Sequence, residues 1–552
     1  MSSVQPEIFK YINESVNPAC RKLLLGSVGG NHLLEAGLRS LDHDSNLAVE
    51  LLSAAWCASP VDGRIAATLM SVDGLLALLP DDMAVCIKNV AEHWKRPENL
   101  SYFMRLAGRR DFDKIGSYLI SNIEKDSGNF FWIQQGLIHA AFRGDYDFAS
   151  AVLKPLKKSM LPVWNAMRSW FAFLEEDNDQ ALNLLIESGK SFGLFNFCSL
   201  AASVFLKLGE KEKAVSILGE TVSAQPWRTS ELLRLHDIVK GIDNRLPSVP
   251  ENLVILLYSY NKAEELDATF RSLFKSDLGN ARIIILDNGS TDSSSCVIDK
   301  WQDSFSSRLK RIDLPVNIGA AAARNWLMTT AEVKASEYVL YLDDDVEVPE
   351  NWLHYFAAAV ENYPDAGAWG CRVVDFSAPR IMQSVDLHLV QPEGSEGDGP
   401  EYNLGEISPN PFKVSDLHHQ GLDSGNFNFM RPCSSVTGCC HLFKTSRLLD
   451  NGGFSLFLSP SQYDDMEHDI RLCLQEEWPV YQGHLRILHR KNTGNASRLS
   501  AKQESNAIGN KYKMQAMHPR SEILKIMAEE EKILRDDLRT KLDFLCRQGV
   551  IA

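Results

Sequence analysis

The sequence predicts an all-α array of helix pairs followed by an α/β domain built on a mainly parallel sheet. Before residue 245, apolar residues recur at helical spacing between short polar breaks. After residue 250, short apolar, β-rich runs alternate with helical segments. A chain of 552 residues is long enough for roughly two to four domains. We expect a helical repeat domain over 1–245, an α/β domain over 250–500 and a C-terminal helical extension over 501–552.

Composition excludes several classes of protein. Hydrophobic residues make up 45% and charged residues 23% of the chain, which is typical of a globular protein. The net charge of −15 disfavours binding to nucleic acid or to an anionic membrane surface. No apolar run approaches the length of about 18 residues that a membrane span needs, and the first residues lack the features of a signal peptide. The 11 cysteines form no CxxC pair. We expect a cytoplasmic protein with reduced thiols.

The first half shows internal repetition. Short polar turns precede a small or apolar residue that opens a second helix, and the last four of these residues are 34, 32 and 33 positions apart. The six positions are Ala48, Ala84, Ile115, Ala149, Ala181 and Ala214. This pattern resembles the tetratricopeptide repeat, which implies a solenoid with a concave surface that binds a protein or peptide. The alternative is that the array only braces the neighbouring domain.

The second half places polar clusters after apolar runs. LVILLYSY, ARIIILDNGS and EYVLYLDDD each end an apolar, strand-like run with polar residues. Ligands of parallel sheets bind beyond the carboxyl ends of the strands. The clusters that fall there are Ser259–Asn261, Asp287–Asp292 and Asp343–Asp345. We therefore expect the functional site at this edge of the sheet.

The run Asp343-Asp344-Asp345 is the strongest single signal. Three adjacent carboxylates repel one another, so burying them requires a compensating cation. Oxygen ligands suit Mg²⁺ or Mn²⁺, which in turn bind diphosphate oxygens. A solvated acidic turn is the alternative, but the apolar strand before the run favours the metal site.

An ordered set of motifs carries a family resemblance. YSYNK, LDNGSTDSS, NIGAAAARN, YLDDDVEVPENW, VTGCCHLFKTSRLLDNGGF, YDDMEHDIRL and LRILH follow one another between about 254 and 490. Together they resemble the GT-A glycosyltransferases of family 2. The resemblance implies a GT-A, Rossmann-like α/β domain and a nucleotide-sugar-dependent enzyme that usually inverts the anomeric centre.

The resemblance also implies a donor site. Asp287 would accept from the base, Arg324 would screen the diphosphate, Asp344 would touch ribose or sugar, and Lys491 would neutralise the departing diphosphate. The nucleotide loops would be formed by Ser259, Tyr260, Asn261, Asp287 and Asn288. The structural alternatives are a simple turn at Asn288-Gly289 and an ion pair between Arg324 and a nearby carboxylate.

Metal ligands and a catalytic base follow from the same resemblance. Asp343 and Asp345 match the acids of the family DxD motif, and His489 would join the metal, with His484 as its competitor in the same strand. Inversion needs a carboxylate that deprotonates the acceptor hydroxyl. Asp465, six residues before Arg471, is the first choice for this base.

Other acids near Asp465 remain open as the base. Glu467 is the second choice, although its spacing to Arg471 favours an ion pair. Asp464 or Asp469 would serve if the register is shifted. The insertion at 375–432 is rich in Gly, Pro and Asp, and we expect it to shape the sugar or acceptor pocket. Within it, His418, His419 and Asp423 are candidate contacts that the sequence does not rank.

The leading hypothesis is a metal-dependent, inverting glycosyltransferase. It would move a sugar from a nucleotide diphosphate to a hydroxyl, with Mn²⁺ or Mg²⁺ stabilising the diphosphate. The helical array favours a protein acceptor, such as flagellin or another surface protein. The alternatives are a polysaccharide or small glycan acceptor, a nucleotidyltransferase, or a noncatalytic scaffold. The Gly-rich phosphate loop of a nucleotidyltransferase is missing from YSYNKAEE, and the intact acids disfavour the scaffold.

Overall fold

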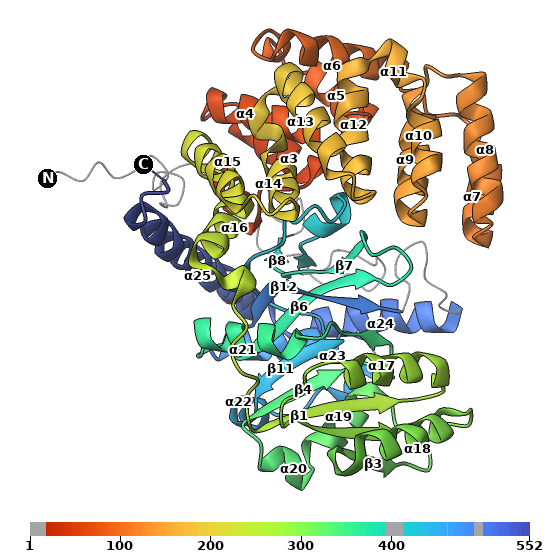
Figure 1. Ribbon diagram of the computed structural model, residues 1–552, viewed down its shortest axis with the longest axis vertical. Helices are drawn as coiled ribbons and strands as arrows, with labels where there is room; N and C mark the ends of the chain where they lie inside the picture. Colours follow the sequence, from red (N-terminus) through yellow and green to blue (C-terminus); the bar gives the residue numbers. More distant parts are fainter. Residues whose placement is uncertain (1–17, 392–411, 461, 491–500, 552) are drawn as a thin grey trace, which may run out of the picture.

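A computed structural model describes residues 18–391, 412–460, 462–490 and 501–551 (Figure 1). An arc of helices forms the N-terminal half and lies against one side of an α/β domain, and the chain ends in a long helix that reaches both halves. The predicted order, a helical array and then an α/β domain, is confirmed. No helix among the described residues is long and apolar enough to cross a bilayer.

The N-terminal half is a series of packed helix pairs. Its helices are α2 (Pro18–Leu25), α3 (Gly30–Ser40), α4 (Ser45–Ala58), α5 (Gly63–Met70), α6 (Asp81–His93), α7 (Ser101–Arg109), α8 (Phe112–Lys125), α9 (Phe130–Arg143), α10 (Tyr146–Leu153), α11 (Leu156–Ser159), α12 (Leu161–Leu174), α13 (Asn178–Phe192), α14 (Cys198–Lys207), α15 (Lys211–Ala224) and α16 (Thr229–Lys240). The pairs in contact are α3/α4, α5/α6, α7/α8, α9/α10, α12/α13 and α14/α15. Each of the six repeat positions lies on the second helix of a pair, as predicted.

The same turn joins the two helices of four pairs. A residue with positive φ ends the first helix: Arg110, Gly144, Glu176 or Gly209. The next residue donates its N–H to a carbonyl five positions back, as in Asp145 N to Ala140 O at 3.0 Å. In three of these turns that next residue is an aspartate, which also caps the second helix; Asp177 accepts from Gln180 N at 3.0 Å. The periodic polar turns of the sequence are therefore helix stop-and-start signals.

The α/β domain is organised by one ten-stranded mixed sheet. Its strands are β1 (Leu253–Ser259), β2 (Arg282–Asp287), β3 (Leu309–Asp313), β4 (Tyr338–Leu342), β5 (Val346–Glu347), β6 (Ala368–Asp375), β7 (Met382–Ser384), β10 (Met430–Pro432), β11 (Cys440–Lys444) and β12 (Val480–His489). The main order is β10-β12-β6-β11-β4-β1-β2-β3, while β5 pairs with β12 and β7 with β6. A separate two-stranded sheet joins β8 (Leu389–Val390) to β9 (Lys413–Val414).

Strand direction gathers the predicted polar clusters at one edge. β1 runs parallel to β2 and β4, and β2 runs parallel to β3, so their carboxyl ends lie together. In this register Ser259 lies beside Asp287. On the other side of β4, β11 is antiparallel, so the residues before it reach the same edge. The nearly continuous apolar runs of these strands are explained by burial on both faces.

Helices cover the sheet on both faces and extend to the C-terminus. They are α17 (Ala263–Lys275), α18 (Ser294–Phe305), α19 (Ala320–Met328), α20 (Ala331–Lys334), α21 (Trp352–Asn362), α22 (Thr445–Asn451), α23 (Asp464–Leu474), α24 (Ala501–Met517) and α25 (Arg520–Arg547). Short 3₁₀ segments lie at Leu75–Ala77, Leu194–Phe197, Ile242–Asn244, Ser306–Arg308, Leu417–Gln420 and Leu456–Leu458.

The two halves share one apolar core. Leu218 and Leu233 of the array, Phe429 and Tyr481 of the α/β domain, and Leu542 of α25 belong to the same buried cluster. Such apolar burial is the main favourable term in folding. The array therefore packs against the α/β domain along α14–α16, and α25 packs against both halves where they meet, a region called the joint below.

Buried polar groups also cross this joint. Arg431 donates to the carbonyl of Leu24 at 2.8 Å and to Asp386 Oδ2 at 2.6 Å. Asp237 of α16 accepts from Met430 N at 2.7 Å. Breaking one partner of such a buried group leaves an unsatisfied donor or charge, so these bonds fix the relative placement of the halves.

The repeated turn predicts a position-specific loss of stability. Asp177→Ala removes the side-chain acceptor of Gln180 N, and we expect a cost of about 0.5–2 kcal/mol, seen as a lower thermal midpoint. Asp179→Ala, an exposed acid in the first turn of the same helix, is the matched control and should change the midpoint less. Equal shifts in the two variants would contradict the capping role. Differential scanning calorimetry measures both.

Candidate active site

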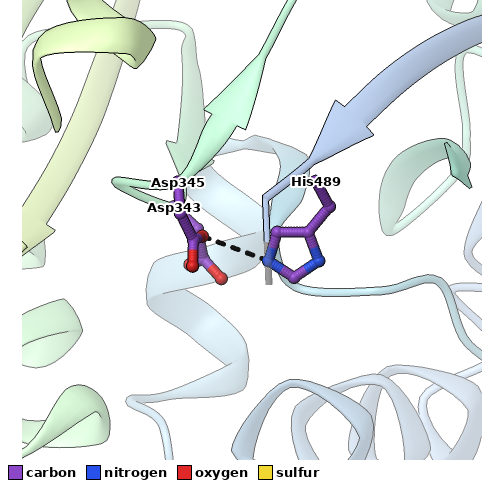
Figure 2. Close-up of side chains that lie close together, drawn as sticks. All are labelled: Asp343, Asp345 and His489. Carbon is purple, nitrogen blue, oxygen red and sulfur yellow. Dashed lines mark hydrogen bonds and ion pairs between the residues drawn. The ribbon is translucent and has the colours of Figure 1, made fainter. Parts of the chain in front are cut away.

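Three potential metal ligands converge at the edge of the sheet. Oxygen or nitrogen atoms of Asp343, Asp345 and His489 all lie within 4.8 Å of one another. Figure 2 shows the two carboxylates facing the imidazole ring, whose Nε2 lies 3.1 Å from Asp345 Oδ1. The aspartates follow the end of β4, and His489 is the last residue of β12. Segments almost 150 residues apart thus supply one cluster of the type that binds Mn²⁺ or Mg²⁺.

The backbone of the aspartate run is held from three sides. Asp343 N donates to Cys439 O at 2.9 Å, Thr269 Oγ1 donates to Asp344 O at 2.9 Å, and Arg490 N donates to Asp345 O at 2.8 Å. Each bond comes from a different element around the sheet edge. The positions of the carboxylates are therefore set by the fold before any ligand binds.

Charge repulsion in this run is offset by a lysine. Lys262 Nζ lies 2.8 Å from Asp344 Oδ1 and 2.7 Å from Asp345 Oδ2. Burial raises the pKa of Asp344 to about 6, against the opposing effect of Lys262. Burial also acts to raise the pKa of Asp345, but its contact with His489 and the charge of Lys262 outweigh burial and lower that pKa. The cluster thus keeps Asp345 ionised.

The ring of His489 is oriented by a residue of the insertion. Its Nδ1 lies 2.8 Å from Gln383 Oε1, while Gln383 Nε2 donates to Asp375 Oδ2 at 3.2 Å. Because an amide oxygen only accepts, Nδ1 must carry the proton. In the neutral ring Nε2 then presents a lone pair toward Asp345, and a bound cation satisfies both groups. The donor set therefore fits a divalent metal ion.

The residues expected at the nucleotide tie three loops together. Asn261 Oδ1 accepts from Thr291 N at 2.7 Å, joining the loops after β1 and β2. Asn288 Oδ1 accepts from Ile318 N at 3.0 Å, joining the loops after β2 and β3. Asp287 Oδ1 accepts from Ser290 N at 2.9 Å. These amides and carboxylates shape the loops.

Two further side chains of the nucleotide loops differ in exposure. Ser259 is buried, while Tyr260 is 43% exposed beside the same loops. Gly289 adopts a φ of 77°, and a Cβ there would lie 2.6 Å from Val316 C, so only glycine fits this turn. The expected turn at Asn288-Gly289 and the expected nucleotide loop are therefore the same structure.

Arg324 is buried among carboxylates and rings. Its Nη1 donates to Asp464 Oδ2 at 2.8 Å, and its Nη2 lies 3.6 Å from Asp343 Oδ1. The guanidinium also lies over the rings of Tyr258 and Phe454. The sequence left open whether Arg324 screens a diphosphate or pairs with a nearby carboxylate. Its contacts in the structure are those of an ion pair. Arg324 links α19 to α23 and to the end of β4.

Asp465 lies beside the segment that holds Asp343. Its Oδ2 accepts from Gly438 N at 2.6 Å, and its Oδ1 accepts from Met466 N at 2.9 Å. The next residue after Gly438 is Cys439, whose carbonyl accepts from Asp343 N. A Cβ on residue 438 would lie 2.6 Å from Asp465 Oδ2, so the glycine makes room for this carboxylate.

The other acids of α23 already have partners. Glu467 pairs with Arg471 at 2.9 Å, as its spacing suggested. Burial acts to raise its pKa, but the hydrogen bond with His518 and the charge of Arg471 lower it. Asp464 pairs with Arg324. Asp469 accepts from Ser435 Oγ at 2.7 Å and from Val436 N at 3.0 Å. Among these four acids, within the described residues, Asp465 is the one with neither an ion pair nor a side-chain donor.

Other candidates lie away from the cluster. His484 Nε2 is 2.9 Å from Asp237 Oδ2, at the joint with the array. Asp423 pairs with Arg372 at 3.1 Å in the same region. His418 is buried there, its ring 4.0 Å from that of His419, and burial lowers its pKa to about 3. Lys491 lies outside the described residues.

Sequence reasoning missed three supporting residues. Gln383 orients His489, Lys262 pairs with the aspartates, and Gly438 leaves space for Asp465. Lys262 lies in the YSYNK motif and Gly438 in the VTGCC motif. The sequence therefore pointed to both segments, but not to the contacts that these two residues make. Nothing in the sequence distinguishes Gln383 from other residues of the insertion.

The transferase-like part of the chain matches a known family. Residues 254–435 match the family model described as Glycosyl transferase family 2. The match confirms the resemblance in this segment, and with it the predicted fold class of a helical array followed by a GT-A domain.

Several curated proteins match part of the chain. The poly-beta-1,6-N-acetyl-D-glucosamine synthase of Staphylococcus epidermidis is 30% identical over 118 residues, which are 21% of this chain and 27% of that protein. The cholesterol galactosyltransferase of Borreliella burgdorferi is 30% identical over 110 residues, which are 20% of this chain and 29% of that protein. The chain thus spans less than a third of the length of these relatives.

Solved structures also align. A mannosyltransferase of Pyrobaculum calidifontis in complex with GDP-Man and Mn²⁺ aligns with a TM-score of 0.35 and 13% identity, over 60% of this chain and 87% of that chain. GalNAc-T7 with UDP, GalNAc and Mn²⁺ aligns with a TM-score of 0.34 and 12% identity, over 54% of this chain and 55% of that chain.

The contact between Gln383 and His489 predicts an effect on metal affinity. Gln383→Leu removes the acceptor of Nδ1, and we expect Mn²⁺ to bind roughly 10–100-fold more weakly, because the ring is no longer held in one orientation. Electron paramagnetic resonance of free Mn²⁺ measures the affinity without donor or acceptor. Gln180→Leu, on the exposed start of α13, is the control. Unchanged affinity in Gln383→Leu would show that this contact does not orient a metal ligand.

Proposed function

We propose that the protein is a metal-dependent, inverting glycosyltransferase that uses a nucleotide-diphosphate sugar. The observation that carries the proposal is the cluster of Asp343, Asp345 and His489, with Asp465 adjoining it across Gly438–Cys439. The cluster lies at the edge of the sheet in a chain that matches glycosyltransferase family 2 over 254–435.

Asp343, Asp345 and His489 hold the divalent ion in this proposal. When bound, Mn²⁺ or Mg²⁺ supplies Lewis-acid stabilisation of the charge that develops on the diphosphate. Lys262 places a positive charge beside these carboxylates. Burial acts to lower the pKa of Lys262, but Asp344 and Asp345 raise it well above its usual range. The lysine therefore stays charged beside the leaving group throughout the reaction.

Asp465 acts as the base that takes the proton of the acceptor hydroxyl. The Gly438 and Met466 N–H groups hold its two oxygens in a fixed orientation, and each oxygen keeps a lone pair for the incoming proton. Attack on the anomeric carbon from the side opposite the diphosphate then inverts its configuration. The nucleotide occupies the loops that follow β1, β2 and β3, where Tyr260 offers an exposed ring.

The helical array recruits a protein acceptor in this proposal. Its support is the solenoid of helix pairs, an architecture that usually presents a binding surface. A glycan acceptor is the second candidate, favoured by the partial match to a poly-beta-1,6-N-acetyl-D-glucosamine synthase. The cytoplasm is the proposed compartment, since the cysteines of the described residues are free thiols.

A nucleotide panel tests the donor class. We expect one of UDP, GDP, CDP and dTDP to raise the thermal midpoint in the presence of Mn²⁺, because a ligand that binds only the folded state stabilises it by mass action. EDTA should abolish the shift, since the diphosphate is bound through the metal. A shift of equal size in EDTA would contradict the metal-dependent site, and no shift with any nucleotide would favour the noncatalytic scaffold.

Substitution of the base separates chemistry from binding. Asp465→Asn keeps the size of the side chain but removes its ability to take a proton, so we expect transfer to fall by roughly 10²–10⁴-fold. Metal-dependent binding of the nucleotide should persist. Asp450→Asn, at an exposed acid of α22, is the matched control. Radiolabelled sugar transfer measures the rate, and full activity in Asp465→Asn would refute the assignment of the base.

A further inference from the structure

Four cationic side chains gather where the helical array meets the sheet. They are Lys207 at the end of α14, Arg372 on β6, Arg380 in the loop after β6, and Arg486 on β12. Figure 1 shows β6, β7 and β12 facing the array beneath α14. The chain as a whole carries a net charge of −15, so this local group of cations differs in sign from the overall charge of the protein.

Two of these arginines lie side by side. Arg372 and Arg486 are register partners on the adjacent parallel strands β6 and β12, so their side chains leave the same face of the sheet. Like charges in such positions repel each other. Arg372 donates from Nη1 to Asp423 Oδ1 at 3.1 Å and to Asn428, but its buried Nε has no partner among the described residues. Among the described residues, none forms a hydrogen bond or ion pair with Arg486, so its donors remain for a ligand.

The other two cations share a single exposed carboxylate. Glu176 Oε1 lies 3.5 Å from Arg380 Nη2 and 3.9 Å from Lys207 Nζ, and the glutamate side chain is 71% exposed. The ion pairs of these four cations thus involve only two carboxylates among the described residues, Asp423 and Glu176. Burial, and after it the neighbouring arginines, lower the pKa of both Arg486 and Lys207.

The cluster lies on the acceptor side of the proposed catalytic centre. Along β12, Arg486 precedes His489 by three residues, a backbone distance of about 10 Å, and the two side chains leave opposite faces of the strand. The sheet order puts β6 and β12 on the side of β11, and Gly438, two residues before β11, contacts Asp465. The nucleotide loops follow β1–β3 at the opposite end of the sheet. An anion at the cluster would therefore lie on the β11–β6–β12 side of the sheet, away from the nucleotide loops.

We propose that Lys207, Arg372, Arg380 and Arg486 bind an oxyanion, phosphoryl or carboxylate, that the acceptor carries. Guanidinium groups suit this ligand because their parallel N–H donors match its oxygens in pairs. The role as an acceptor site rests on the proposed function, whereas oxyanion binding itself does not. The substrate class that follows is an acidic acceptor, anchored between the array and the sheet while its hydroxyl reaches Asp465.

Anion titration in EDTA tests the site without metal or donor. The full chain is titrated with inorganic phosphate and, separately, with acetate at constant ionic strength, and its thermal midpoint is recorded. We expect saturable stabilisation of the wild type by one of the two anions. The half-saturating concentration should rise at least 10-fold in Arg486→Gln and in Arg380→Gln. Arg271→Gln, at an exposed arginine that pairs with Asp267 on α17, should behave like the wild type.

The outcomes separate this inference from the proposed function. Saturation by phosphate at the lower concentration assigns a phosphoryl ligand, and saturation by acetate assigns a carboxylate. Equal titrations in the wild type, Arg486→Gln and Arg380→Gln, or no saturable stabilisation by either anion, would overturn the oxyanion site even if nucleotides bind with Mn²⁺. Because Arg380 lies in a loop, its variant remains informative if Arg486→Gln fails to fold. Saturable anion binding in a protein that binds no nucleotide would count against the proposed function alone.

Discussion

Mutual repulsion of three consecutive aspartates is the constraint around which this α/β domain is built. Lys262 lies between two of the carboxylates, and Arg324 approaches the third from α19. Hydrogen bonds between the backbone of the run and Thr269 Oγ1, Cys439 O and Arg490 N fix the run to neighbouring elements. Burying this much negative charge costs folding free energy unless it is compensated. The aspartate run therefore lowers the stability of the fold at the same edge of the sheet where it could bind a cation.

Much of the fold could be predicted because its signals are local. The period of the array reflects a repeated turn in which a residue such as Glu176 ends one helix and Asp177 caps the next. The strands were visible as apolar runs because both faces of the sheet are covered. The six small or apolar positions lie on the second helices for the same local reason.

The candidate site was predictable only where its residues follow strands in recognisable motifs. Asp343, Asp345 and His489 could be proposed together because the family resemblance implied a shared metal, and their convergence is seen in the structure. Gln383 could not be found, since its role depends on β7 pairing with β6, which brings the side chain to the end of β12. The same limit applies to Arg372 and Arg486, which become neighbours only through strand pairing.

The apolar core shared by the array, the sheet and α25 bears on how this protein can be divided. The linker near residue 245 marks a change of sequence pattern, yet cutting the chain there would uncover Leu233 on one fragment and Phe429 and Tyr481 on the other. Neither fragment would keep a closed surface, and each would tend to aggregate. We therefore expect the segment after residue 245 to aggregate when it is expressed without the helical array.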